Sequence, residues 1–331
     1  MKTRVPPVRE QYGSAGTGMF LTLIFLNILW AGANPAAKVM MEHHRPEWVA
    51  GFRFIGTALI LGLLLSLPAF RRVFAPHIPT YLPHVLTMAA VGFFGVSSAY
   101  ICYFWGTQLS TATEATLLVS SSPIFYALLA RLALREPFPP QKTLGILLGL
   151  AGVWVIVNKG LLLREFTGAT LGNLLVLAGV LIESVNVVVG KSLAMRYSGV
   201  SLLWIESTAA AISLTLIGFL VAGAPNLSWT ASDFWAWGYL TLICTVFAFS
   251  VWFYLMERAP VGGMGVSVFA QTPAAGFIGY FLLKESLHWT IWIGAALILL
   301  GMLLTLRAKA PAAAGGGLSS PESLRSETPS P

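Results

Sequence analysis

Four charged residues of the sequence lie inside long apolar segments. They are Arg53 in "GFRFIG", Glu114 in "TATEAT", Glu183 in "GVLIESVNVVVGKSL" and Glu206 in "LLWIEST". A charge at the centre of a bilayer costs at least about 2.5–3.5 kcal/mol, so each needs a partner, a polar cavity or, for a carboxylate, a proton. Such residues can bind a charged ligand or carry a proton, and a purely structural role is the alternative that stays open for them.

The positions of these charges along their segments place them in two layers. With a rise of about 1.5 Å per residue, Glu183 and Glu206 come roughly 10 Å and about 9 Å from the same membrane edge. We therefore hypothesise a Glu183/Glu206 cluster in the inner half. Arg53 and Glu114 fall in the outer half with Lys38 nearby, so we hypothesise an Arg53–Glu114 contact there. A carboxylate of the inner cluster could couple a membrane process to a proton gradient or bind an amine.

Other polar and aromatic residues of the apolar segments are candidates for the wall of a cavity. Aromatic side chains in such segments belong to the packed core more often than to a binding site, so packing is the alternative. The candidates are Trp30, Asn34, Tyr100, Tyr103, Trp105, Ser120, Ser121, Asn186, Trp252 and Gln271.

The composition excludes a soluble protein. Of the 331 residues, 56% are hydrophobic and 10% are charged, and the mean hydropathy is +0.76, whereas a soluble domain has about 25% charged residues. The net charge of +7 comes from basic residues scattered at the ends of apolar runs, which argues against nucleic acid as a partner. Both cysteines lie in apolar runs and no HExxH, GxSxG or GxxxxGK motif occurs, so we expect no metal, cofactor or ATPase engine. The histidines of "EHHRPE" (42–47) are expected to be solvated, with a metal site as the minor alternative.

Ten apolar stretches are long enough, at about 20 residues, to cross a membrane. Short connections rich in proline, glycine and asparagine separate them, so the predicted fold class is an all-α integral membrane protein. The segment 1–17 precedes the first stretch, and the Ala/Gly/Ser/Pro-rich tail 307–331 is predicted to be disordered. The stretches are 18–40, 48–70, 83–108, 111–133, 141–157, 169–190, 200–222, 234–256, 263–283 and 289–306.

Lysine and arginine residues are distributed unequally between the two sides of these stretches. With the N-terminus in the cytoplasm, thirteen of them fall on the cytoplasmic side and four outside. Because cytoplasmic loops are enriched in these residues, the sequence predicts a multi-pass protein of the cell membrane with both termini in the cytoplasm.

Two parts of the sequence share a motif, a glutamate followed by two glycines with the spacing E-x8-G-x6-G. Five predicted spans per copy is an odd number, so the copies should cross the membrane in opposite directions, as inverted five-helix repeats (18–158 and 169–306) around a central cavity. We expect the glutamates to cap or anchor loops, the glycines to allow close helix packing and the prolines to kink helices. The motif residues are Glu136, Gly145 and Gly152, then Glu285, Gly294 and Gly301 each 149 positions later, with Pro123 and Pro273 upstream.

These motifs resemble the EamA family of the drug/metabolite transporter superfamily. The resemblance lies in "LNILWAGANPAAKVM", in "PIFYALLARLALRE" with its following glycines, and in the second copy "PAAGFIGYFLLKE". It covers approximately residues 19–306 and implies a ten-helix transporter with two five-helix repeats around a central cavity. Such proteins move amino acids, other metabolites, nucleotide-linked compounds or drugs. The sequence has "RE" and "KE" where the family often has "GE", and one residue fewer between proline and glutamate in the second copy; these departures concern the loops and not the fold.

The expected function is that of a secondary transporter without enzymatic activity, which exports a small metabolite by alternating access. The expected partners are a small-molecule substrate and the lipid bilayer, with protons as a candidate coupling ion. A membrane enzyme acting on a lipid-linked substrate is the alternative, but the loops hold too few paired acid–base groups for it. A channel is a further alternative, which the different polar residues of the two halves disfavour.

Overall fold

The computed structural model describes residues 16–125, 128–129, 140–158, 167–194, 196–256, 270–285 and 287–307. Every regular element within these ranges is a helix. In the first half the elements are α1 (Gly16–Ala31), α2 (Ala33–Met40), α3 (Pro46–Ser66), α4 (Pro68–Phe74), α5 (Leu82–Ala90), η1 (Val91–Val96), α6 (Ser97–Leu109), α7 (Ala112–Val119) and α9 (Pro140–Asn158). In the second half they are α10 (Gly168–Ala194), α11 (Gly199–Ile217), η2 (Gly218–Ala222), α12 (Ala231–Gly238), η3 (Tyr239–Phe247), α13 (Ala248–Met256), α15 (Gln271–Phe281) and α16 (Trp289–Arg307).

Local sequence explains several helix ends. Proline occupies the first turn of α3, α4 and α5, where its missing N–H costs nothing because the first N–H groups of a helix lack partners inside it. Pro68 also ends the second predicted stretch early, since α3 stops at Ser66 and α4 begins at Pro68. Helix α12 begins with a capping box between Thr230 and Asp233, a reciprocal arrangement that satisfies two backbone donors.

Three segments, η1, η2 and η3, are π-helical and continue α-helices without a break. Segment η1 joins α5 to α6, and η3 joins α12 to α13. A π-helical turn widens the backbone and occurs often at functional sites. The hydrophobic pattern of the sequence does not distinguish these segments from α-helix.

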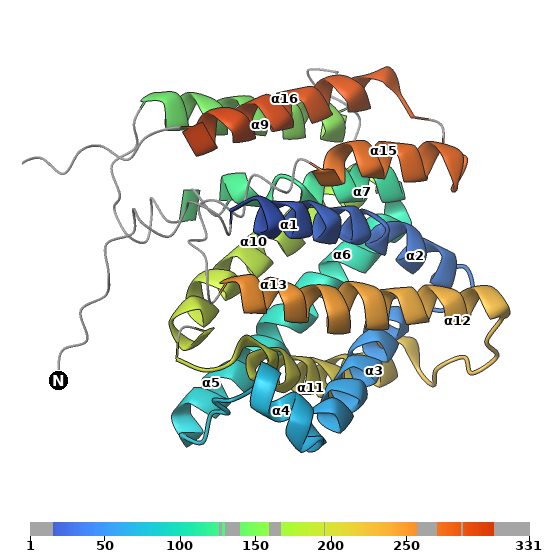
Figure 1. Cartoon of the computed structure of the whole chain (residues 1–331). Helices are drawn as coiled ribbons and strands as arrows, with labels where there is room; N and C mark the ends of the chain where they lie inside the picture. Colours follow the sequence, from blue (N-terminus) through green and yellow to red (C-terminus); the bar gives the residue numbers. More distant parts are fainter. Residues whose placement is uncertain are drawn as a thin grey trace, which may run out of the picture.

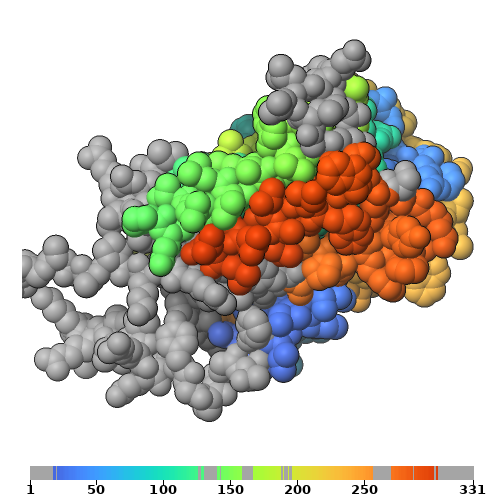
Figure 2. Space-filling view, turned by 90° about the horizontal axis from the view of Figure 1, so that it is seen from above, coloured from blue at the N-terminus to red at the C-terminus, as the bar shows by residue number. Residues whose placement is uncertain are grey.

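The helices of the two halves are interleaved. Helices α9 and α16 lie side by side as an upper layer (Figure 1), and their neighbouring positions are also clear from above (Figure 2). Helix α6 packs against α10, α3 against α11, and α7 against α15. A core of buried hydrophobic side chains joins residues from both halves, among them Met40, Phe104, Val180 and Leu214.

The motif glycines lie at the contact between α9 and α16. A Cβ atom added to Gly152 would lie 2.6 Å from the carbonyl oxygen of Gly294, and one added to Gly301 would lie 2.4 Å from that of Gly145. Carbon and oxygen atoms cannot approach so closely, so side chains at these positions would push the helices apart.

Six helical stretches are long and apolar enough to cross a membrane. Large hydrophobic side chains on them face outward; Leu59 is 69% exposed, Leu220 85% and Trp235 82%, an arrangement suited to lipid rather than water. Two shorter apolar helices, Thr143–Asn158 and Trp289–Gly301, correspond to the fifth and tenth predicted stretches, while the fourth and ninth extend in part outside the described residues. The six are Leu21–Met40, Pro46–Ser66, Leu82–Leu109, Gly168–Val187, Gly199–Ala222 and Ala231–Leu255.

Candidate functional site

Arg53 lies buried in α3, with 2% of its surface exposed. Its Nε atom donates a hydrogen bond to Thr245 Oγ1 in η3 at 2.8 Å, and its guanidinium carbon lies 4.7 Å from the centre of the Tyr100 ring. The face of an aromatic ring attracts a cation, most strongly where water is excluded. The arginine thus bridges α3, α6 and η3.

Glu183 lies on α10, and its carboxylate accepts a hydrogen bond from the hydroxyl of Tyr103 on α6. The rings of Tyr100 and Tyr103 meet edge to face, with centroids 5.6 Å apart. A chain of contacts thus leads from Arg53 through Tyr100 and Tyr103 to Glu183. We call Arg53, Tyr100, Tyr103 and Glu183 the central charged cluster.

The π-helical segment η3 supplies the polar groups on the other side of Arg53. The Thr245 hydroxyl donates to the carbonyl oxygen of Leu240 at 2.7 Å, five residues earlier in the chain, and so presents its oxygen to Arg53. The indole N–H of Trp30 on α1 donates to the Cys244 carbonyl at 2.9 Å. The widened π-helical turn therefore explains why the Thr245 hydroxyl can face α3 and the Cys244 carbonyl can accept a hydrogen bond from α1.

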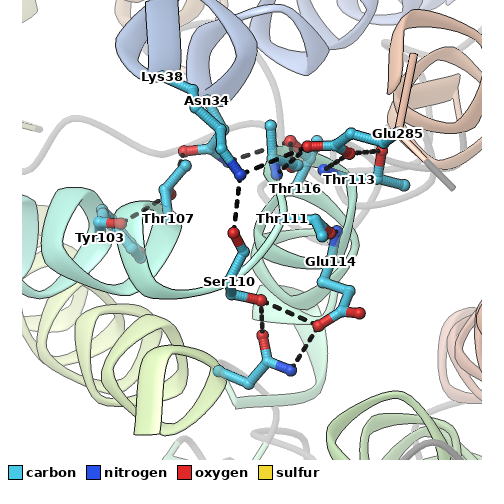
Figure 3. Close-up of polar contacts among 12 residues, drawn as sticks. Asn34, Lys38, Tyr103, Thr107, Ser110, Thr111, Thr113, Glu114, Thr116 and Glu285 are labelled. Carbon is cyan, nitrogen blue, oxygen red and sulfur yellow. Dashed lines mark hydrogen bonds and ion pairs between the residues drawn. The ribbon is translucent and has the colours of Figure 1, made fainter. Parts of the chain in front are cut away.

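A second polar network joins α2, α6, α7 and α10 (Figure 3). The Asn34 amide donates to Thr116 Oγ1 at 3.0 Å and accepts from Thr107 at 3.3 Å. Glu114 Oε2 lies 2.9 Å from Ser110 Oγ and accepts from Asn173 Nδ2 at 2.8 Å.

Glu285 caps the start of α7 from the segment that follows α15 (Figure 3). Its carboxylate accepts hydrogen bonds from the backbone N–H of Ala112 at 2.8 Å and of Thr113 at 3.1 Å, and from the Thr113 hydroxyl at 2.7 Å. Lys38 Nζ lies 3.6 Å from Glu285 Oε1 and donates to the Ser110 carbonyl at 2.7 Å. A carboxylate at a helix N-terminus stabilises the helix because the free N–H groups there carry partial positive charge.

The sequence profile of the EamA-like transporter family matches residues 17–158 and 170–307. The chain belongs to this family. The match confirms the resemblance found in the sequence. Together with the apolar helices, membership makes this EamA protein a multi-pass membrane protein of the transporter class.

Several curated relatives of this EamA protein are also transporters by name. An uncharacterized transporter of Archaeoglobus fulgidus is 26% identical over 86% of this chain and 96% of its own. The uncharacterized transporter YetK of Bacillus subtilis is 25% identical over 87% of each chain. A protein of Streptantibioticus cattleyicolor named as a probable terminal-alkyne amino-acid exporter is 26% identical over 86% of this chain and 92% of its own. A known crystal structure shares the fold, with a TM-score of 0.64 at 19% identity over 91% of this chain and 99% of that chain.

Three of the four charged residues of the EamA protein have polar partners other than those hypothesised. Within the described residues, Arg53 bonds to Thr245 and Glu114 to Ser110 and Asn173, and no ion pair joins Arg53 to Glu114. The polar partner of Glu183 is Tyr103, not Glu206.

Glu206 instead lies on α11 beside η1. A Cβ atom added to Gly92 of η1 would lie 2.2 Å from the Glu206 carbonyl oxygen, and one added to Gly95 would lie 2.1 Å from the Asn186 amide oxygen. The backbone at Glu206 on α11 and the side chain of Asn186 on α10 therefore pack against the same π-helical segment.

The remaining predicted residues are spread over the second half of the fold and its edges. Gln271 is buried at the start of α15, and Pro273 lines an apolar cleft of about 320 Å³ between α7, α15 and α16. Pro123 is half-buried just after α7, while Glu136 lies outside the described residues.

Of the two histidines expected to be solvated, His43 is exposed but His44 is buried. His44 is 4% exposed and Glu47 1%. His43 Nδ1 lies 3.1 Å and His44 Nε2 3.7 Å from the Asp233 carboxylate. No group of three or more His, Cys, Asp or Glu side chains that could hold a metal ion occurs among the described residues. The pair thus joins the α2–α3 connection to the capped start of α12.

Proposed function

We propose that this EamA protein is a secondary transporter that exports amino acids, related small metabolites or drugs by alternating access. The observation that carries the proposal is the central charged cluster. Arg53, Tyr100 and Tyr103 come from the first matched segment, whereas Glu183 and the Arg53 partner Thr245 come from the second. A transporter built from two related halves binds its substrate where the halves meet.

We further propose that the halves are inverted five-helix repeats, 18–158 and 169–306. The protein then lies in the plasma membrane with both termini in the cytoplasm. Two features support this arrangement. The excess of lysine and arginine on one side supports the orientation. The pairing of α3 with α11, α7 with α15 and α9 with α16 joins helices that take corresponding places in the two halves.

Two observations favour amino acids among the possible substrates. A relative carries the name of a probable terminal-alkyne amino-acid exporter. The central charged cluster offers both a cation and an anion, the two charges that an amino acid needs as partners.

A flux assay tests the proposal. The full-length protein is reconstituted into proteoliposomes and scanned with radiolabelled neutral amino acids, organic cations, organic anions and nucleosides, with and without a pH gradient. We expect flux of an amino acid that Glu183→Gln abolishes and Glu42→Gln, at an exposed loop position, leaves unchanged. Flux no greater than in protein-free liposomes for every compound would overturn the proposal.

A further inference from the structure

Two opposite charges lie near the centre of the fold without touching each other. Within the described part of the chain, Arg53 makes one hydrogen bond, from Nε to Thr245, and no ion pair. Glu183 accepts one hydrogen bond there, from Tyr103. Each charge therefore keeps hydrogen-bonding capacity that no described side chain uses, because a guanidinium has five N–H donors and a carboxylate about four acceptor sites.

A membrane-buried charge with unused hydrogen-bonding capacity needs compensation, since its desolvation is costly. Among the described residues, Arg53 and Glu183 form no ion pair with each other and are linked only through the contacts of Tyr100 and Tyr103. A direct ion pair would neutralise both charges and leave little for a ligand. The observed separation instead leaves a cation on α3 and an anion on α10 available to a third group.

We propose that Arg53 and Glu183 recognise the two charges of a zwitterionic substrate, an α-amino acid. Arg53 binds the carboxylate, for which its planar fork of N–H groups is well shaped, and Glu183 binds the ammonium group. This inference rests on the proposed transport function, because it assigns the substrate class of the same site.

The proposed arrangement also predicts which charged compounds the site rejects. An organic anion would be attracted by Arg53 and repelled by Glu183, and an organic cation would meet the reverse. Rejection by the mismatched charge discriminates as effectively as attraction by the matched one. Only a molecule with both charges satisfies both residues.

The test uses analogues that lack one charge at a time. The full-length protein in proteoliposomes is assayed for transport of L-leucine and L-phenylalanine, and for competition by their amides, which lack the carboxylate, and their N-acetyl derivatives, which lack the ammonium. We expect the wild type to transport the zwitterions, with both kinds of analogue competing at least about 30-fold more weakly.

The variants should shift this preference in opposite directions. Arg53→Met should weaken binding of the amino acid at least about 30-fold but change binding of the amide little. Glu183→Gln should likewise weaken binding of the amino acid at least about 30-fold but change binding of the N-acetyl derivative little. Arg71→Met and Glu42→Gln, both at exposed positions, serve as controls and should match the wild type. A general loss of stability cannot produce opposite changes in analogue preference.

Other outcomes separate the two proposals. If the wild type transports compounds with one charge or none as well as zwitterions, or if both variants weaken all three compounds equally, the inference is wrong although the transporter function stands. If no amino acid, cation, anion or nucleoside is transported, the proposed function itself fails.

Discussion

Glu285 accepts hydrogen bonds from the backbone N–H groups of Ala112 and Thr113 while Lys38 Nζ lies 3.6 Å from its carboxylate. A side chain from the second matched segment thus caps a helix of the first. The side chain of Glu285 is 10% exposed, so little water can replace it. The halves of the protein are held together at this end by a helix cap and an ion pair on one carboxylate.

Removing this carboxylate should destabilise the protein in graded steps. We expect Glu285→Ala to lower the free energy of unfolding by about 1–3 kcal/mol, because it leaves the N–H groups of α7 without acceptors. Glu285→Gln keeps an acceptor oxygen and should cost less. Thermal unfolding in detergent measures both, with Glu42→Ala at an exposed position as the control. Equal effects of alanine and glutamine would show that the hydrogen bonds to α7 are not what stabilises this end.

Lys284, directly before Glu285, adopts a left-handed backbone conformation in the turn after α15. Its φ of 55° is the one positive value for a non-glycine residue within the described part of the chain, and an L-residue pays about 1–2 kcal/mol for this conformation. Lys284→Gly should therefore raise the free energy of unfolding by up to about 1 kcal/mol, part of the gain being lost to the extra freedom of glycine in the unfolded chain. Lys284→Ala keeps the strain and should give no such gain. A larger gain for alanine than for glycine would contradict this account.

The close approach of α7 and α15 offers a direct test of movement. A Cβ atom added to Gly279 would lie 3.1 Å from the Cβ of Thr113, a few tenths of an ångström short of the usual separation of about 3.5–4.5 Å across a disulfide. In a background without Cys102 and Cys244, the pair Thr113→Cys and Gly279→Cys should therefore cross-link on oxidation. If these helix ends separate in each cycle, oxidation should stop flux and reductant restore it.

The controls for the cross-link are the same double variant under reducing conditions and Thr113→Cys alone. The reduced double variant should transport as well as Thr113→Cys alone, and oxidant should not change the flux of the single variant. Full flux through the oxidised, cross-linked protein would show that α7 and α15 stay together during transport.

The family and most of the apolar stretches could be predicted from the sequence, but the contacts of the charges could not. Depth follows from the rise per residue along a helix, which places Arg53 and Glu114 in one layer. Whether they meet depends on the direction of each side chain around its helix, which tertiary packing sets. Arg53 faces Tyr100 and Thr245, whereas Glu114 faces Asn173.

The π-helical segments are a second reason why the contacts of the charged residues could not be predicted from the sequence. A wide turn rotates every later side chain of its helix, so regular spacing does not predict that Thr245 faces Arg53. The sequence predicts that the motif glutamate Glu285 caps or anchors a loop, but it does not predict that Lys38 lies beside it. The missing information was which helix start it would cap, and that depends on how the two halves pack.

The hydroxyl of Thr245 should matter for stability where that of Thr241 does not. Both threonines are buried in η3, one helical turn apart. Thr245 Oγ1 accepts from Arg53 Nε, whereas Thr241 Oγ1 is buried without a hydrogen-bond partner among the described residues. Valine has nearly the same shape as threonine, so each exchange removes the hydroxyl with little change in packing.

We expect Thr245→Val to lower the free energy of unfolding by about 1–3 kcal/mol, because it leaves a buried donor of the charged Arg53 unpaired. Thr241→Val should be neutral or stabilising, since it removes a polar group that is already unsatisfied. Thermal unfolding in detergent compares the two, and amino-acid flux should fall only in Thr245→Val because Arg53 then loses the bond that orients it. Similar losses in both variants would mean that the threonines act through packing alone, and the Arg53–Thr245 bond would then have no special part in holding the guanidinium group.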